Sequence, residues 1–264
     1  MFQRLIKNDL KENKVSMLVI GLFLLLTLTL SFAATRLTVS LTSSIERFVE
    51  TAKSPHLLQM HSGSVDRERL QNFVQQHPEI ASWQLTDFVN VEGSAIRINE
   101  KNSLQDSSQD NGFSSQNQNF DFLLDQNNQP AQPQPGQVYI PLYYYNNGKI
   151  KIGDKIRVGK LQLTVQGFIR DAQMNAGLVS SKRFLISQTD LQTLKKEAFA
   201  SNENLIAFRV HKLSQISAIE QAYKNAELES NGPPMITYPT IKMINGFNDA
   251  LVILVMGLLV VAII

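Results

Sequence analysis

Cysteine is absent from all 264 residues. The chain therefore forms no disulfide bonds and no thiolate metal sites, which excludes disulfide-rich scaffolds and zinc fingers. A surplus of one charge is also missing, because 25 lysines and arginines stand against 23 acidic residues, for a net charge of +2. A nearly balanced chain lacks the basic field that attracts nucleic acid, so we expect no nucleic-acid partner.

Motifs for nucleotide and hydrolase chemistry are missing as well. The chain contains neither G-x-x-x-x-G-K-[ST] nor G-x-G-x-x-G, so it does not bind ATP by such a loop. The stretch His61–Ser64 lacks the G-x-S-x-G pattern of a nucleophile elbow and is interpreted as a turn. We therefore expect no enzymatic activity, no catalytic residue and no cofactor bound by this chain.

Residues that often ligate metals or move protons are present but scattered. None of the histidines belongs to an H-E-x-x-H pattern. They are His56, His61, His77 and His211. Four carboxylates lie in predicted turns or at strand ends, where such residues are favoured for structural reasons. They are Asp121, Asp125, Asp154 and Asp171. We expect no metal site.

A long run without charge organises the chain. Residues 15–35 contain no charged side chain and are flanked by Lys14 and Arg36. A run of this length can cross the hydrocarbon core of a bilayer as one helix, which bonds its backbone polar groups internally. We predict a first transmembrane helix at 15–35. Because the apolar residues continue at helical spacing beyond Arg36, the helix is expected to continue as a stalk to about residue 53.

The flank before this run is basic, which predicts a cytoplasmic N-terminus. Residues 1–14 also place Phe2, Leu5, Ile6 and Leu10 near one helical face. This pattern favours an amphipathic helix in the membrane interface, and a plain charged flank stays open as the alternative. A cleaved signal peptide ending near Ala33 is a further alternative, although the apolar run exceeds the usual signal core of about 7–15 residues.

A second apolar run begins near Phe247 and continues to Ile264, where the sequence stops. We predict a second transmembrane helix at 247–264 that is truncated, either because the chain is a fragment or because the gene is split. The residues between the two runs, 36–246, are mostly polar, and predicted strands alternate there with predicted helices. This pattern favours a compact α+β domain, a large extracytoplasmic domain between two spans.

Several elements of this domain follow from local patterns. Ser64 is the expected N-cap of a helix. Val138–Ile140 and Ile156–Val158 are expected strands, and the alternating residues 161–169 follow a Gly159-Lys160 hairpin turn. Other expected strands span 56–61, 83–99, 183–187, 204–211 and 235–238, and other expected helices span 188–198 and 214–229.

Two segments of the domain depart from these patterns. Residues 101–119 are rich in Ser, Gln, Asn and Asp and poor in apolar residues, which predicts a flexible surface insertion. The run Tyr143, Tyr144 and Tyr145 is either an exposed aromatic patch that contacts a partner or a half-buried part of the domain.

The stretch 138–187 resembles a known family. VYIPLYYYNNGKIKIGDKIRV followed by LQLTVQGFIRD is similar to the core of FtsX-like ABC transporter permeases, the family that includes MacB. DAQMNAGLVSSKRFLIS is similar to the next segment in such permeases from Gram-positive bacteria. The motif covers about 50 residues, and the order of basic start, span, long loop and second span agrees with it.

The resemblance implies four spans per subunit, a permease dimer in the bilayer of the bacterial plasma membrane, and a cytoplasmic ABC ATPase that binds the ATP. The permease subunit of this family performs no chemistry of its own, so no catalytic residue is carried over. The sequence stops within the predicted second span, so it does not contain the later spans that the resemblance implies.

Three functions of different classes follow. The first is a permease subunit that couples ATP hydrolysis by its partner to movement of the extracytoplasmic domain, for export or mechanotransmission. The second is a membrane-anchored sensor or scaffold that recruits an extracytoplasmic protein or peptide, such as a cell-wall hydrolase, without transport. A membrane-tethered enzyme is the third, and the missing catalytic motifs disfavour it.

Overall fold

The computed structural model describes residues 14–174, 180–232 and 235–236, together with the single positions Ala250, Ile253 and Gly257. The chain divides into two compact units, one of residues 1–46 and 240–264 and one of residues 47–239. The predicted interfacial helix at 1–14 and the predicted second span at 247–264 lie almost entirely outside the described residues.

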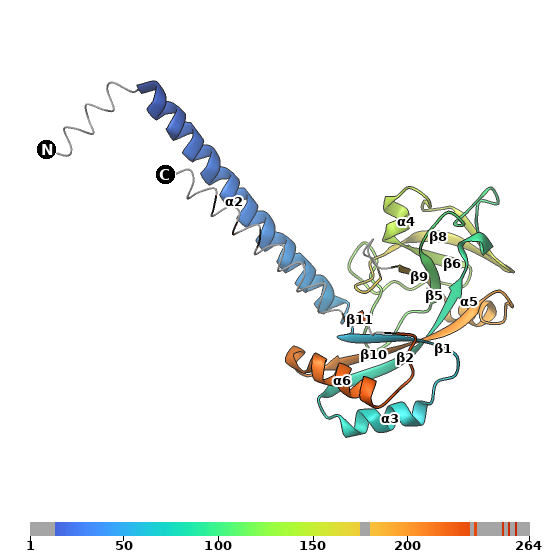
Figure 1. Ribbon diagram of the computed structural model, residues 1–264. Helices are drawn as coiled ribbons and strands as arrows, with labels where there is room; N and C mark the ends of the chain where they lie inside the picture. The colour runs from blue at the N-terminus through green and yellow to red at the C-terminus, as the bar shows by residue number, and fades with distance from the viewer. Residues whose placement is uncertain are drawn as a thin grey trace. The chain divides into compact units, whose positions relative to one another are not determined.

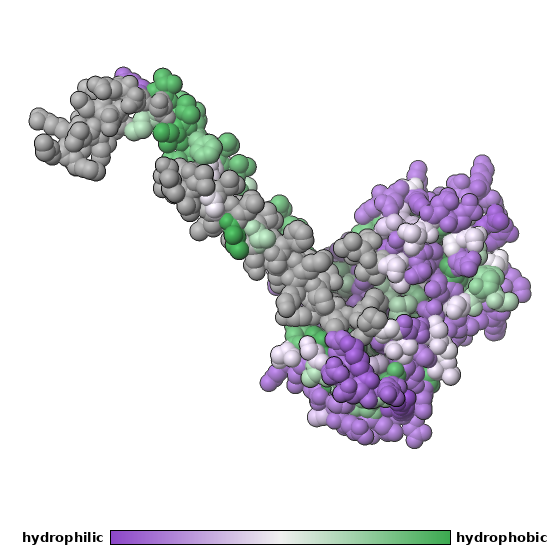
Figure 2. All heavy atoms as spheres, in the orientation of Figure 1, coloured by the Kyte–Doolittle hydropathy of each residue, from purple (hydrophilic) through white to green (hydrophobic). Residues whose placement is uncertain are grey.

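Helix α2 (Lys14–Thr51) is one unbroken helix of 38 residues, and its described surface is largely apolar (Figures 1 and 2). Within the described part of the chain it is the one helix long and apolar enough to cross a membrane, judged by length and composition. Four hydroxyl groups within the predicted span donate to carbonyls three or four residues earlier, so they are satisfied within the helix, as lipid requires. They belong to Thr27, Thr29, Ser31 and Thr35.

The end of α2 is set by backbone geometry rather than by proline. Lys53 adopts a left-handed conformation with φ of 45°. Its N–H donates to the carbonyl of Glu50, and the N–H of Ser54 donates to that of Val49, both at 3.0 Å. These two bonds form a Schellman motif, and the last helical residue, Thr51, lies four residues before Pro55.

The domain of residues 47–239 is a mixed sheet with helices (Figure 1). Its strands are β1 (Leu57–Ser62), β2 (Ile80–Val91), β3 (Ile96–Ile98), β4 (Asn102–Ser103), β5 (Asp110–Ser114), β6 (Gln137–Pro141), β7 (Lys155–Val158), β8 (Leu161–Ile169), β9 (Ser181–Ile186), β10 (Ser201–Val210) and β11 (Met235–Ile236). Its α-helices are α3 (Arg67–Gln76), α4 (Leu142–Asn146), α5 (Gln188–Leu194) and α6 (Ile216–Asn225), and the short 3₁₀ turns are η1 (Gly93–Ala95) and η2 (Leu213–Gln215).

The strands of the described part are linked in the order β11-β1-β10-β2-β5-β9-β6-β8-β7-β3-β4. The pairs β5/β9 and β6/β8 are parallel, and the other pairs are antiparallel. The predicted hairpin is present, because β7 and β8 pair with Val158 opposite Leu161. In β8 buried residues alternate with more exposed ones, as its sequence pattern requires.

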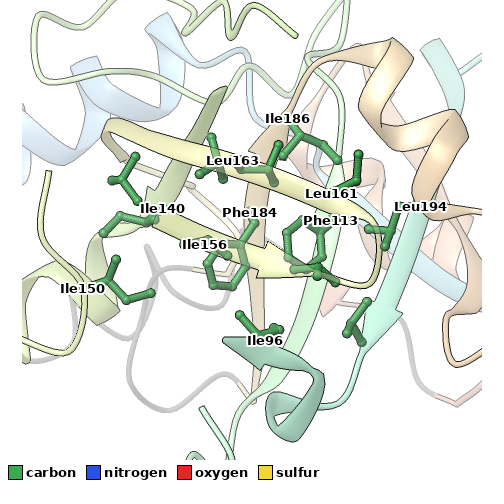
Figure 3. Close-up of a cluster of buried hydrophobic side chains, with 14 of the residues drawn as sticks. Ile96, Phe113, Ile140, Ile150, Ile156, Leu161, Leu163, Phe184, Ile186 and Leu194 are labelled. Carbon is green, nitrogen blue, oxygen red and sulfur yellow. The ribbon is translucent and has the colours of Figure 1, made fainter. Parts of the chain in front are cut away.

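Two large hydrophobic clusters lie on different parts of the sheet. One is built around Phe113 of β5 and Phe184 of β9, whose rings stack with centroids 4.9 Å apart, and includes residues of β3, β6, β7 and β8 (Figure 3). The other joins α3 and α6 to β10, with Phe73, Phe208 and Tyr223 in mutual edge contact. Strand β9 is buried along its whole length and occupies the middle of the strand order.

The prediction of a flexible insertion at 101–119 is wrong. The segment contains β4 and β5, and β5 pairs with β2 on one side and with β9 on the other. Phe113 is fully buried. A segment poor in apolar residues is thus ordered by its neighbours, which contribute most of the buried surface.

Smaller differences concern helix ends. Asp66, not Ser64, caps α3, because its side chain accepts the N–H of Arg69 at 3.0 Å. Helix α5 ends at Leu194 and α6 at Asn225, several residues before the predicted ends.

Gly112 of β5 tests the packing of this unexpected strand. A Cβ atom at this position would overlap the ring of the fully buried Phe88. We predict that Gly112→Ala lowers the free energy of unfolding by roughly 1–3 kcal/mol through overpacking. Phe88→Leu combined with Gly112→Ala should cost less than the sum of the two single changes, as measured by denaturant unfolding in detergent. Additive effects would contradict the predicted contact.

Candidate functional site

The three predicted contact tyrosines lie in different environments. Tyr144 is fully buried, its hydroxyl bonds to the side chains of Asn111 and Ser107, and burial raises its pKa to about 12. Tyr143 is half-buried with Lys182 Nζ 5.0 Å from its ring centre, and Tyr145 is 40% exposed. Tyr144 therefore belongs to the core, and partner contact stays a prediction for Tyr145 and the exposed part of Tyr143.

Potential metal ligands do not gather in the described residues. No group of three histidine, aspartate or glutamate side chains is placed to hold an ion there. The densest polar contacts of the described residues lie instead inside the unit of residues 47–239, around the last turn of α2 and the residues that follow it. We call residues 48–56 and the groups that bind them the junction.

The junction binds four successive carbonyl groups of the chain that leaves α2. The N–H of Phe122 donates to the carbonyl of Ala52 at 2.8 Å, and that of Asp121 donates to Lys53 at 3.0 Å. The guanidinium of Arg209 donates to Ser54, and Gln173 Nε2 donates to Pro55 at 3.1 Å. Since these donors belong to three separate parts of the domain, the segment is fixed from several sides.

Two further contacts extend the junction in both directions along the chain. Before it, the guanidinium of Arg170 lies 5.3 Å from the ring centre of Phe48 in the last turns of α2, within cation–π range. After it, the N–H of His56 donates to the carbonyl of Phe208 at 2.8 Å, and β1 begins at the next residue. The helix end therefore continues directly into the sheet.

The loop that binds the helix end, residues 120–124, is itself held by amide side chains. Gln116 accepts the N–H of Leu123 at 3.1 Å and donates to its carbonyl at 2.8 Å. Asn117 donates to the carbonyl of Asp121 at 3.0 Å, and Gln84 donates to that of Phe120 at 3.2 Å. A loop with its main chain satisfied in this way is a firm contact for α2.

A buried ion cluster connects this loop to the centre of the sheet. Arg183 of β9 donates to Asp121 at 2.7 and 3.2 Å and to Asp171 at 2.7 Å. All three side chains are at most 5% exposed. Asp171 also accepts the N–H groups of Gln173 and Met174, at 2.7 and 3.1 Å. Both Asp121 and Gln173 bind the helix end, so two routes from α2 converge on Arg183.

The two carboxylates of the cluster differ in electrostatic environment. Burial raises the pKa of Asp121 above its usual range, although Arg183 opposes this effect. Burial acts in the same sense on Asp171, but Arg183 and the two N–H groups together hold its pKa below the usual range. Burial tends to lower the pKa of Arg183, and its two carboxylate partners more than compensate and raise it, so Arg183 stays charged.

His56 adds a titratable group to the junction. Its Nδ1 accepts the N–H of Val210 at 3.0 Å, which requires that nitrogen to be unprotonated. Burial, assisted by the nearby charge of Arg209, lowers the pKa of His56 to about 4. His56 is therefore neutral at physiological pH.

Sequence reasoning missed the cluster. Asp121 and Asp171 are interpreted from the sequence as turn residues, and nothing local pairs them across 50 positions. One signal is present in the sequence, because Arg183 begins a predicted strand whose next three residues are apolar, and a buried charge without a partner would be costly there. That signal predicts a buried partner without identifying it.

Among the three comparisons with known proteins, the search of solved structures finds similar proteins. No protein-family model matches the chain, and no curated protein matches it. An extracellular domain of the noncanonic ABC-type transporter YknZ from Gram-positive bacteria is 11% identical at a TM-score of 0.34, covering 68% of this chain and 98% of that one.

Two further structures are similar to the chain. A domain of a protein described as a permease, from Porphyromonas gingivalis, is 13% identical at a TM-score of 0.33 and covers 66% of this chain and 86% of its own. The periplasmic region of MacB from Actinobacillus actinomycetemcomitans is 9% identical at a TM-score of 0.36. The match covers 76% of this chain and 98% of that one.

Removal of the buried cation tests the energetic role of the cluster. Arg183→Gln leaves two buried carboxylates without their counter-charge, and we predict a loss of roughly 3–5 kcal/mol in the free energy of unfolding. Arg157→Gln is the matched control, because Arg157 pairs with Glu100 on the surface, where such a pair contributes about 0–1 kcal/mol. Denaturant unfolding in detergent measures both. Equal losses would contradict the assigned role.

Acidification tests His56. Its pKa is lower in the folded chain than in the unfolded one, so the unfolded chain binds more protons between pH 4 and 6.5. Its contribution to stability is complete above pH 6.5 and is lost as the pH falls towards 4. His56→Asn keeps an acceptor near the N–H of Val210 and should flatten the dependence of the melting temperature on pH between 5 and 6.5. An unchanged slope would show that His56 does not titrate as assigned.

Proposed function

We propose that the chain is the permease subunit of an ABC transporter of the FtsX/MacB type. In this proposal residues 15–35 cross the bacterial plasma membrane, the N-terminus is cytoplasmic, and residues 36–246 form the extracytoplasmic domain. The segment at 247–264 is the second span. A cytoplasmic ABC ATPase binds and hydrolyses ATP, and two permease subunits form the membrane unit.

The motif resemblance at 138–187 and the apolar helix α2 support the family and the membrane location. The observation that carries the mechanism is the junction. A transmitter of movement needs a stiff helix and a connection to the outer domain that does not yield when the helix moves. Residues 52–55 supply this connection, because all four of their carbonyls are bound by the domain.

The hydrogen bonds of the junction act in parallel, so a force on the end of α2 is shared among them. A displacement of the end of α2 acts at once on the loop of Phe122, on β10 through Arg209 and on the turn that contains Gln173. Asp121 connects the loop of Phe122 to Arg183 in the middle strand, and Asp171 connects the turn that contains Gln173 to the same side chain. The domain is therefore expected to follow a movement of residues 48–51, the last turn of α2, which belong to the same compact unit.

A second function, a sensor or scaffold without transport, is favoured by one surface feature. Tyr145 stacks on Phe168 with ring centres 4.6 Å apart and remains 40% exposed, and Ile152 is 50% exposed. Apolar groups of this kind are common in protein contacts. Capture of an extracytoplasmic protein by the chain in the absence of any ATPase, lost in Tyr145→Ala, would support this reading over the permease.

A distance measurement tests the permease proposal. Because the chain has no cysteine, Gln75→Cys on the exposed surface of α3 gives a single labelling site. We predict that the distance between labels in two subunits changes when the partner ATPase is stalled with ATP bound, compared with the nucleotide-free complex.

Asp121→Asn, which weakens the ion cluster without changing side-chain size, should reduce this change in distance. Asp66→Asn is the matched control, since asparagine caps a helix as well as aspartate does, and it should leave the change intact. Identical distances with and without ATP would refute the proposal. An equal response of the two variants would refute the role of the junction.

A further inference from the structure

Two neighbouring hollows on the domain surface have opposite charge. They have volumes of about 560 and 650 Å³ and share Gln105 as a common wall. Both adjoin residues 101–110, which are part of the segment 101–119 that the sequence predicts as a flexible insertion and that instead contains β4 and β5. No function described above uses them.

The first hollow is basic. Arg97, Lys101 and Lys149 line it, with Asp106 as the one acidic residue in its wall. All three basic side chains are exposed. Within the described part of the chain none of them forms a salt bridge. Its positive charge is therefore available to a ligand or a partner.

The second hollow is acidic. Glu92, Asp110 and Glu203 line it, and no basic residue does. A smaller hollow of about 330 Å³ shares Asp110 and Glu203 and extends the same negative surface. Phe199, 42% exposed, provides an apolar group in the wall. Three carboxylates thus lie beside the three unpaired cations, separated by the wall at Gln105.

We propose that this face docks onto the same face of a second copy of the chain, with the basic hollow of each copy against the acidic hollow of the other. A two-fold axis near Gln105 exchanges the two hollows, so each charge contact forms twice. Closed two-fold pairs of this kind are the commonest protein assemblies. Complementary charge on one surface selects a second copy over a partner of a single charge sign.

The affinity expected for this contact is sufficient for two copies anchored in the same membrane. Exposed ion pairs contribute about 0–1 kcal/mol each, so the contact is weak between free molecules. Anchoring two copies in one bilayer raises their effective concentration and makes a weak contact sufficient. The inference rests on the proposed function for the membrane anchor and for the pairing of two subunits, and it adds the face through which their outer domains meet. It needs no ATPase, so it can fail while the permease proposal stands.

Cysteine cross-linking of the full chain in liposomes tests the docking. Gln105→Cys lies next to the proposed axis, and it should form a disulfide with its own copy under mild oxidation. The yield should fall as salt is raised, because the charges are exposed. Gln75→Cys replaces another exposed glutamine on α3, away from both hollows, and should not cross-link.

Charge reversal supplies the decisive comparison. In the Gln105→Cys background, Lys101→Glu and Glu92→Lys should each lower the yield about five-fold, and the two together should restore it. Absence of cross-linking at every salt concentration would overturn the proposal. Cross-linking that neither reversal changes, or a double reversal that fails to restore it, would also overturn it.

Discussion

A guanidinium held between two carboxylates at the centre of the sheet is the constraint on which the rest of the domain depends. Arg183 is nearly inaccessible to water, so its charge must be balanced where it stands. Asp121 and Asp171 balance it, and in doing so they fix the loop over residues 120–124 and the turn at 171–174. Both segments in turn bind the end of α2.

The two faces of β9 therefore pack against different parts of the domain. Phe184 and Ile186 belong to the cluster of stacked aromatic rings, which makes the sheet stiff. Arg183 and Leu185 alternate with them and face the loop that binds the helix end. A displacement of the end of α2 thus reaches the middle strand of the sheet. The charged hollows beside Gln105 lie on a different part of the domain, where we propose that a second copy binds.

Local pattern was enough to predict α2, the β7/β8 hairpin and most strands, because charge-free length and alternation are properties of a short window. It was insufficient for β5, whose residues DNGFS resemble a turn and become a strand only because β2 and β9 provide partners on both sides. Local pattern did not predict the ion cluster for the same reason. Asp121 and Asp171 each have an ordinary local interpretation as turn residues, and only the fold brings them to Arg183.

The central claim is that the domain binds the end of α2 firmly enough to move with it. Hydrogen exchange at the amides of Asp121 and Phe122 tests this most directly, because both donate to carbonyls of the segment that follows α2. If the junction is firm, these amides exchange as slowly as those of β10, although they belong to a loop. Exchange at the rate of an exposed loop would contradict the claim.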